Sequence, residues 1–95
     1  MLTTAQKQKL KALAHNRKPV VIIGGNGLTE SVSEEIGRAL NDHELIKVRV
    51  NAADRTQRDG MIGRICEGTG AELVQRIGHV AVLYRRNADG PKVTL

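Results

Sequence analysis

The sequence predicts an α/β fold of the two-layer α+β type, with elements in the order α-β-α-β-α-β-β around a mixed four-stranded sheet. Helical spacing of apolar residues marks three segments, 3–15, 29–41 and about 54–69. Short β-branched runs mark four strands, 20–23, 45–50, 72–77 and 80–84. The strand–helix–strand units imply parallel pairs with right-handed crossovers, and the Gly78-His79 turn implies a closing antiparallel hairpin.

The first helix is expected to begin at Thr3 or Thr4, either of which can serve as its N-cap. Its inward stripe consists of Leu10, Leu13 and Ala14. If both crossovers run the same way, the second and third helices share one face of the sheet. The first helix is then free to cover the other face of the first strand.

That first strand follows Pro19, which disfavours helical geometry at Lys18 and so starts an extended segment. The run Val20–Ile23 has no polar alternation, and we therefore expect both its faces to be covered. The next strand, 45–50, does alternate. Lys47 and Arg49 point away from its apolar side and would share the face of the first helix.

The later helices carry recognisable ends. Thr29 is the expected N-cap of the second helix, and the glutamates after it complement the positive end of the helix dipole. Asp54 to Gln57 is a variant capping box for the third helix, whose inward stripe is Met61, Ile62, Ile65 and Cys66. Gly70 is the expected stop. We expect residues 1–86 to form one domain and residues 87–95 to form a weakly ordered basic tail.

Composition limits the function. Tyr84 is the only aromatic residue, so no platform of stacking rings for nucleobases can be built. The net charge is +5, and residues 1–29 contain no Asp or Glu. This concentration is a candidate footprint for polyphosphate, although a merely soluble basic protein would show it too. A single Cys, no signal peptide and no apolar span predict a cytoplasmic protein without membrane contact.

The glycine turn between the first strand and the second helix is the candidate site. Gly25-Asn26-Gly27 lacks the third glycine of a dinucleotide fingerprint, and no lysine completes a Walker A loop. What remains is Gly24-x-x-Gly27 at a helix N-terminus, where free N–H groups favour a phosphate. KH domains clamp an RNA backbone with such a GxxG loop. A tight strand-to-helix connection is the alternative.

The predicted RNA-binding residues are the turn with the helix start and the basic residues of the two chain ends and the second strand. A solvated face is the alternative for the lysines. The set is Gly24, Gly25, Asn26, Gly27, Leu28, Thr29, Lys7, Lys11, Arg17, Lys18, Lys47, Arg49, Arg85 and Arg86.

Catalysis has little support in the sequence. His15, His43 and His79 lack metal-ligand spacing and are expected to be solvated or capping residues. Glu34 and Glu35 are adjacent, so they point to different sides of a helix and form no acid–base pair. We expect no active site, no metal, no cofactor and no small-molecule substrate.

The residues from Lys7 to Val50 resemble the CRM domain family in its bacterial stand-alone, YhbY-like form. The matching parts are Leu13-Ala14-His15, Lys18-Pro19-Val20, the loop Gly24 to Thr29, the stretch His43 to Val48, and Gly78 with Val82 to Arg85. The resemblance covers about residues 4–86. One departure is Gly25, where relatives often carry Lys or Ser; any grip at the loop would then come mostly from backbone groups.

The resemblance implies a fold like the C-terminal domain of translation initiation factor three, with sheet order 1-2-4-3. It also implies RNA binding through the GxxG loop and nearby basic residues. Stand-alone bacterial members are associated with large-subunit ribosomal precursors, and multi-domain plant relatives act in splicing organellar group II introns. The expected function is therefore non-catalytic RNA binding in ribosome assembly, on precursor ribosomal RNA in a pre-ribosomal particle. The alternative is a protein-interaction adaptor that binds a ribosomal protein without contacting RNA.

Overall fold

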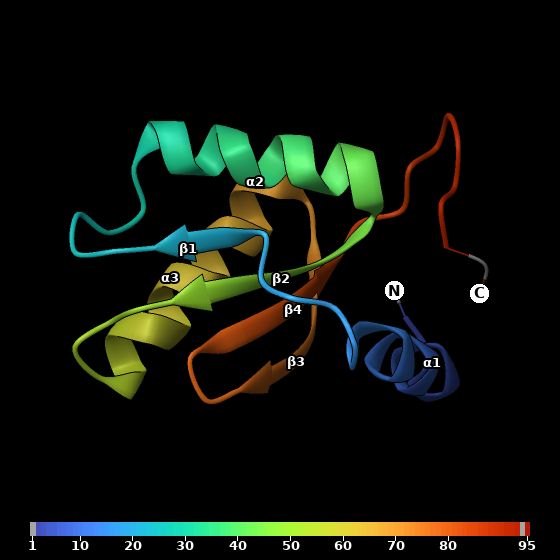
Figure 1. The fold of residues 1–95 in the computed structure, drawn as a ribbon, viewed down its shortest axis with the longest axis horizontal. Helices are drawn as coiled ribbons and strands as arrows, with labels where there is room; N and C mark the ends of the chain where they lie inside the picture. The colour runs from blue at the N-terminus through green and yellow to red at the C-terminus, as the bar shows by residue number, and fades with distance from the viewer. Residues whose placement is uncertain (1, 94) are drawn as a thin grey trace.

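The computed structural model describes residues 2–93 and 95, and its element order matches the prediction (Figure 1). The sheet order is β1-β2-β4-β3, with β1 parallel to β2 and the other neighbouring pairs antiparallel. The helices are α1 (Thr4–Ala14), α2 (Glu30–His43) and α3 (Arg55–Thr69). The strands are β1 (Val21–Ile23), β2 (Leu45–Val50), β3 (Glu72–Ile77) and β4 (Val80–Tyr84). The predicted fold class is confirmed.

The helix ends follow the local chemistry of the sequence. Thr3 makes a capping box with Gln6, and the hydroxyl of Thr29 accepts a hydrogen bond from the Val32 N–H. The Asp54 carboxylate accepts a hydrogen bond from the Gln57 N–H at 2.8 Å. The Gln57 side chain reaches back one residue further than a capping box requires, to the Ala53 N–H. Gly70 ends α3 at φ +75.

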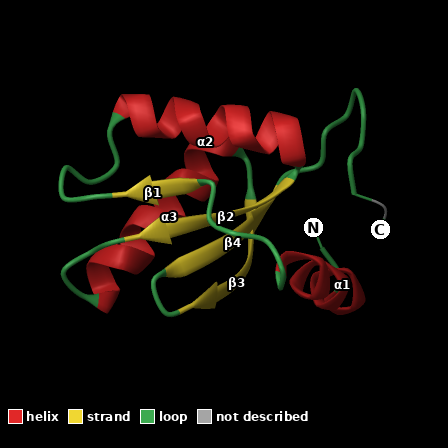
Figure 2. Ribbon diagram, in the orientation of Figure 1, coloured by secondary structure: helices red, strands yellow, loops and turns green. Residues whose placement is uncertain are grey.

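The sheet has an apolar cluster on each face. On one face, α2 and α3 bury Ile36, Leu40, Met61, Ile62 and Ile65 against alternate residues of the strands (Figure 2). On the other face, α1 buries Leu10 and Ala14 against apolar residues of β2, β3 and β4, namely Leu45, Val74, Val82 and Tyr84. Both clusters consist mainly of aliphatic side chains because the chain contains only one aromatic residue.

The expected position of α1 was wrong. The helix packs against β2 and β3 rather than over β1, because its apolar partners lie on the central strands. The second face of β1 is therefore open: Ile22 is 61% exposed, so the expectation that both faces would be covered was also wrong. Leu13, expected in the inward stripe, is 42% exposed because only Leu10 and Ala14 face the sheet.

The segment after β4 makes contacts that the sequence did not indicate. The Glu44 carboxylate accepts hydrogen bonds from the N–H groups of Asn87, Lys92 and Val93 at 2.5, 2.5 and 2.6 Å. Val93 is buried in the α1 cluster. Burial raises the pKa of Glu44, but the three N–H donors and the charge of Arg86 outweigh it, so the net pKa lies below the ordinary value. Weak order of residues 87–95 stays a prediction, and Met1 and Thr94 lie outside the described residues.

Candidate nucleic-acid interface

The glycine loop, Gly24–Gly27, joins the carboxyl end of β1 to α2. Its turn is closed by a hydrogen bond from the Gly27 N–H to the Gly24 carbonyl at 3.0 Å. Gly27 has φ +72, and a Cβ placed on it would lie 3.6 Å from Cε of Met61 in α3. Glycine at 27 is thus required by backbone conformation, since L-residues are strained there. Gly24 and Gly25 have no such restriction, and both are exposed.

The loop presents hydrogen-bond donors to solvent. Within residues 2–93 and 95, the N–H groups of Gly25 and Asn26 have no hydrogen-bond partner. Thr29 caps the Val32 N–H at 3.2 Å, which leaves the N–H groups of Glu30 and Ser31 in the first turn of α2 to solvent. Such a group of donors at the positive end of a helix suits a phosphate. The carboxylate of Glu30 works against this, because it lies in the same turn.

The sheet face beside the loop carries a row of side chains in register across all four strands, of which Ile22, Arg49 and Ile77 are exposed and Val80 is half-buried. Ile22 pairs with Arg49, Arg49 with Val80, and Val80 with Ile77. Ile22 and Ile77 are 61% and 58% exposed, and we call these four residues the open row. Arg49 also donates from Nε to Oδ1 of Asn51 at 3.1 Å. The predicted ligand Arg49 therefore lies next to the strand that leads into the glycine loop.

Three other predicted residues meet in a basic groove of about 530 Å³. The groove lies between the connector from α1 to β1, the first half of β2 and the end of α2. Its charged and titratable lining is Arg17, Lys18, Lys47, Lys92, Asp42 and His43. Arg17 is held there by a hydrogen bond of 2.5 Å to the Leu45 carbonyl. Lys92 comes from the tail and was not among the predicted ligands.

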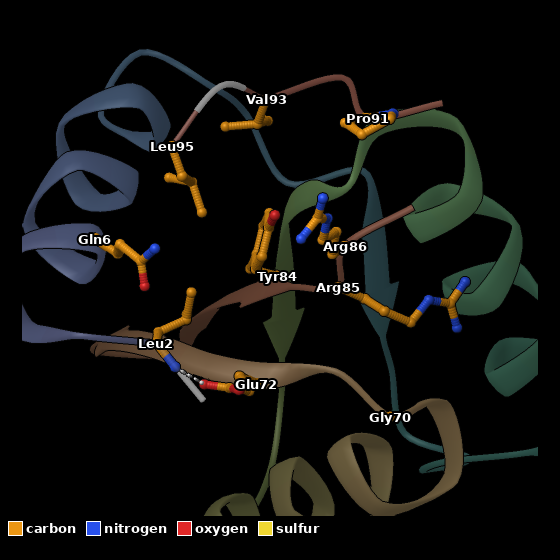
Figure 3. A pocket seen from close by; sticks show the side chains of 10 residues that line it. All are labelled: Leu2, Gln6, Gly70, Glu72, Tyr84, Arg85, Arg86, Pro91, Val93 and Leu95. Atoms are coloured by element: carbon orange, nitrogen blue, oxygen red, sulfur yellow. Dashed lines mark hydrogen bonds between the residues drawn. The ribbon is translucent and has the colours of Figure 1, made fainter. Parts of the chain in front are cut away.

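The remaining predicted cations lie away from the loop. Lys7 and Lys11 are on α1, at the opposite end of the sheet (Figure 1). Arg85 extends toward α2, where its guanidinium donates to the carbonyls of Thr69 and Gly37 and to Oδ1 of Asn41 at 2.6 to 3.2 Å (Figure 3). These bonds tie together the end of α3 and the middle of α2. Arg86 is exposed and lines, with Tyr84 and Val93, a separate cavity of about 520 Å³.

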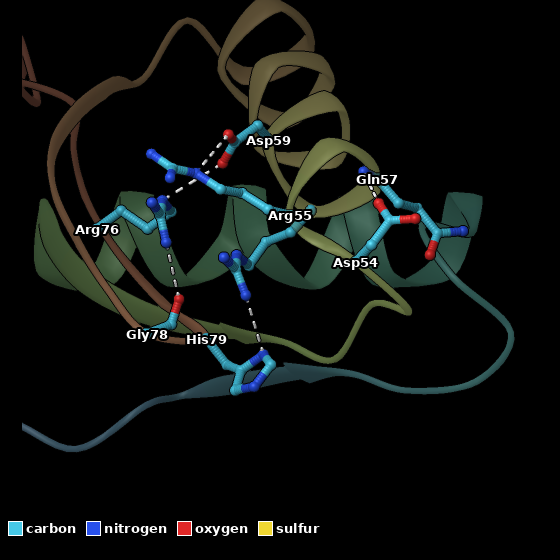
Figure 4. Close-up of polar contacts among 8 residues, drawn as sticks. Asp54, Arg55, Gln57, Asp59, Arg76, Gly78 and His79 are labelled. Carbon is cyan, nitrogen blue, oxygen red and sulfur yellow. Dashed lines mark hydrogen bonds and ion pairs between the residues drawn. The ribbon is translucent and has the colours of Figure 1, made fainter.

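Several arginines at the same end of the sheet as the loop were missed by the sequence analysis. The segment 51–58 follows β2, the parallel neighbour of β1, so it lies at the same edge of the sheet as the glycine loop. Arg55 there is 75% exposed and pairs with Asp59 at 3.8 Å, whereas Arg76 pairs with Asp59 at 3.3 Å (Figure 4). Arg58 contacts Nδ1 of His79 at 3.3 Å. The shared edge of parallel strands was the signal that could have found them.

No arrangement for catalysis is visible in the described part of the chain. Among those residues, no group of three or more His, Cys, Asp or Glu side chains could hold a metal ion. Burial, with a smaller contribution from Glu72, raises the pKa of the Cys66 thiol, which keeps it protonated and a poor nucleophile. No helix in that part is long and apolar enough to cross a membrane.

The comparison with known families identifies the chain. The family model of the CRS1/YhbY (CRM) domain matches residues 2–85. The chain belongs to the CRM domain family. It is 58% identical over 88 residues to an RNA-binding protein of Haemophilus influenzae, covering 93% of this chain and 89% of that one. It is also 32% identical over 95 residues to a probable RNA-binding protein of Bacillus subtilis, covering 100% and 99%.

A solved structure has the same fold. The solution structure of a Staphylococcus aureus protein, described as a hypothetical protein and candidate RNA-binding protein, superposes with a TM-score of 0.85. The two chains are 37% identical, and the match covers 100% of this chain and 99% of the other. The predicted family and fold are therefore both confirmed.

Proposed function

We propose that this CRM domain is a non-catalytic RNA-binding protein that acts in the cytoplasm on precursor RNA of the large ribosomal subunit. The exposed glycine loop carries the proposal, because its unpaired N–H groups stand at the N-terminus of α2. Membership of a family whose relatives are named RNA-binding proteins supports it. The loop holds the sugar-phosphate backbone, and Arg49, Lys47, Lys18 and Arg17 neutralise neighbouring phosphates.

The loop lends itself to a test at Gly25. An aspartate there adds a negative charge, and its Cβ meets nothing within 4 Å, so the fold should be unaffected. Gly27 is a poorer position because its φ of +72 would add backbone strain. Binding of a fluorescein-labelled RNA hairpin with an unpaired loop is measured for wild type and Gly25→Asp. We expect a loss of about tenfold or more, the size of one or more charge-assisted hydrogen bonds.

The matched control is Gly68→Asp, which makes the same charge change near the far end of α3, where a Cβ also meets nothing within 4 Å. Its affinity should fall far less than that of Gly25→Asp. Equal affinities for Gly25→Asp and wild type would contradict the loop as the RNA-binding element.

Phosphate neutralisation is tested separately at Lys18. Protein–RNA affinity falls with salt in proportion to the number of phosphates neutralised. We expect Lys18→Ala to reduce the slope of log K against log salt by about one phosphate contact. An unchanged slope would remove Lys18 from the interface.

A second candidate function rests on the open row. Ile22 and Ile77 expose apolar surface on a sheet face that also presents Val80. Such surface also suits a protein, so an adaptor that binds a ribosomal protein without contacting RNA is the alternative. It predicts a stoichiometric complex that survives nuclease and high salt and is lost in Ile22→Ser. If the association with the ribosomal protein is lost on nuclease treatment, RNA mediates it, and the first function is favoured.

A further inference from the structure

The basic groove contains one cation from the tail, and the tail is held by a buried carboxylate. Glu44 is 0% exposed and is the only charged residue fully buried among those described. Its two carboxylate oxygens accept the N–H groups of Asn87, Lys92 and Val93. Its carbonyl also accepts the Arg85 N–H at 3.0 Å. The path of the chain from β4 to Lys92 is thus fixed at both ends by a single residue.

The backbone at Glu44 indicates that this arrangement is maintained against strain. Glu44 has φ +61 and ψ −48, the only positive φ at a non-glycine residue in the described chain. Such conformations are unfavourable for an L-residue and persist where surrounding contacts hold them. Here those contacts are the tail's N–H groups. The hydrogen bond from the Lys92 N–H to the Glu44 carboxylate fixes the position of the Lys92 backbone.

Lys92 is one of the residues that line the basic groove. It is exposed and lines the same concavity as Arg17, Lys18 and Lys47. The groove thus has four basic side chains, one carboxylate, that of Asp42, and one imidazole, that of His43. The cations outnumber the carboxylate, so the groove suits a polyanion.

We propose that the basic groove is a second phosphate-binding subsite for the RNA strand held at the glycine loop, and that Lys92 is one of its ligands. Glu44 is a positioning residue that places Lys92 without touching RNA. The proposal rests on the proposed RNA-binding function. It extends the interface to the C-terminal tail, which neither the family match over residues 2–85 nor the motifs in the sequence include.

The geometry of β1 supports one continuous strand of RNA. Val20 lines the groove and Gly24 begins the loop, so the two sites are separated by about 13 Å at a strand rise of about 3.3 Å per residue. A single RNA strand covers that distance within a few nucleotides. Lys47 lines the groove, and Arg49 lies on the same face of β2 beside Ile22 of β1, between the groove and the loop.

The test compares Lys92→Ala with Lys9→Ala, a matched control that removes an exposed lysine of α1 outside the groove. Affinity for the labelled RNA hairpin is measured over a salt series. We expect Lys92→Ala to reduce the slope of log K against log salt by about one phosphate contact, and Lys9→Ala to leave it unchanged. Lys92→Arg should restore the slope, because it restores the charge.

The positioning role of Glu44 is tested in the same assay. Glu44→Gln replaces one accepting oxygen by an NH2 group that cannot accept, which should free the tail from the turn before β2. We expect its slope to fall as much as that of Lys92→Ala, and the double variant to fall no further. Amide hydrogen exchange at Lys92 and Val93 should accelerate in Glu44→Gln and stay slow in Lys92→Ala.

The possible failures are distinguishable. If wild type does not bind the hairpin, the proposed function fails and the subsite with it. If Gly25→Asp loses affinity while Lys92→Ala keeps the wild-type slope, RNA binding at the glycine loop is supported and the proposed subsite is wrong. If inorganic phosphate shifts the NMR signals of Lys18 and Lys92 but the hairpin does not, the groove is a small-anion site and the proposal is also wrong.

Discussion

Two turns at opposite ends of the sheet each contain a residue at positive φ, but they accommodate it differently. These residues are Gly27 at φ +72 after β1 and Glu44 at φ +61 before β2. Glycine adopts this conformation without strain, so the glycine loop needs few internal contacts, and the N–H groups of Gly25 and Asn26 stay unpaired. Glu44 is strained, and three hydrogen bonds from the tail hold it in place. The first turn is open to a ligand, whereas the second is closed by the protein itself.

The largest expected effect follows from removing the closed turn's carboxylate. Glu44→Ala leaves three N–H groups of the tail without their acceptor and keeps the unfavourable φ. We expect the free energy of unfolding to fall by about 2–4 kcal/mol, measured by urea denaturation. Glu44→Gly should lose less, because glycine relieves the backbone strain. Equal losses would show that strain at this residue is unimportant.

Acid should weaken the same turn. The pKa of Glu44 lies below its ordinary value of 4.5 because backbone N–H donors and Arg86 outweigh the effect of burial. Burial and, to a smaller extent, the charge of this carboxylate raise the pKa of Tyr84. A lowered folded-state pKa contributes stability above the unfolded-state pKa, and this is lost as pH falls through the folded-state value. Urea midpoints of wild type should therefore fall at acid pH more steeply than those of Glu44→Gln; parallel curves would refute the role of Glu44.

The open turn should show a smaller effect on stability. Gly27→Ala forces an L-residue to φ +72 with its Cβ 3.6 Å from Met61, and should cost about 1 kcal/mol. Gly25→Ala should change the free energy of unfolding little, since nothing lies within 4 Å of its Cβ. Urea denaturation of the two variants checks this. A larger loss at Gly25 would mean that the loop is packed rather than open.

The smallest expected effect concerns the charge beside the loop. Glu30 lies in the first turn of α2, where it competes with a phosphate for the positive end of the helix. Glu30→Gln should therefore strengthen RNA binding about two- to fivefold at low salt, an effect of 0.3–1 kcal/mol. The matched control is Glu67→Gln near the end of α3. Equal changes in both variants would indicate a general charge effect and no local one.

The fold was largely predictable because its local signals agree with its topology. Caps at Thr29 and Asp54, the stop at Gly70 and the hairpin at Gly78 all lie where the sequence places them. The position of α1 was not predictable, because Leu10 and Ala14 could pack on the second face of the sheet either over β1 or over the central strands. The contacts of Glu44 with the tail were also missed, since nothing in the sequence marks a glutamate in a turn as buried.

The candidate site was predictable in part. The glycine loop and Arg49 follow from motif and strand order, and Lys18 and Lys47 share a groove. The role of Arg85 could not be foreseen, because its partners Thr69, Gly37 and Asn41 lie 16 to 48 residues away in the sequence. A count of charges does not distinguish a cation facing solvent from one that ties two helices together.

The most direct test of the account is an NMR titration of ¹⁵N-labelled protein with the RNA hairpin. If the open turn holds the RNA backbone, the amide signals of Gly25 and Asn26 should shift strongly and saturate with the RNA. Those of Gly68 and Thr69, at the far end of α3, should stay in place. Unchanged signals from Gly25 and Asn26 at saturating RNA would contradict the central claim.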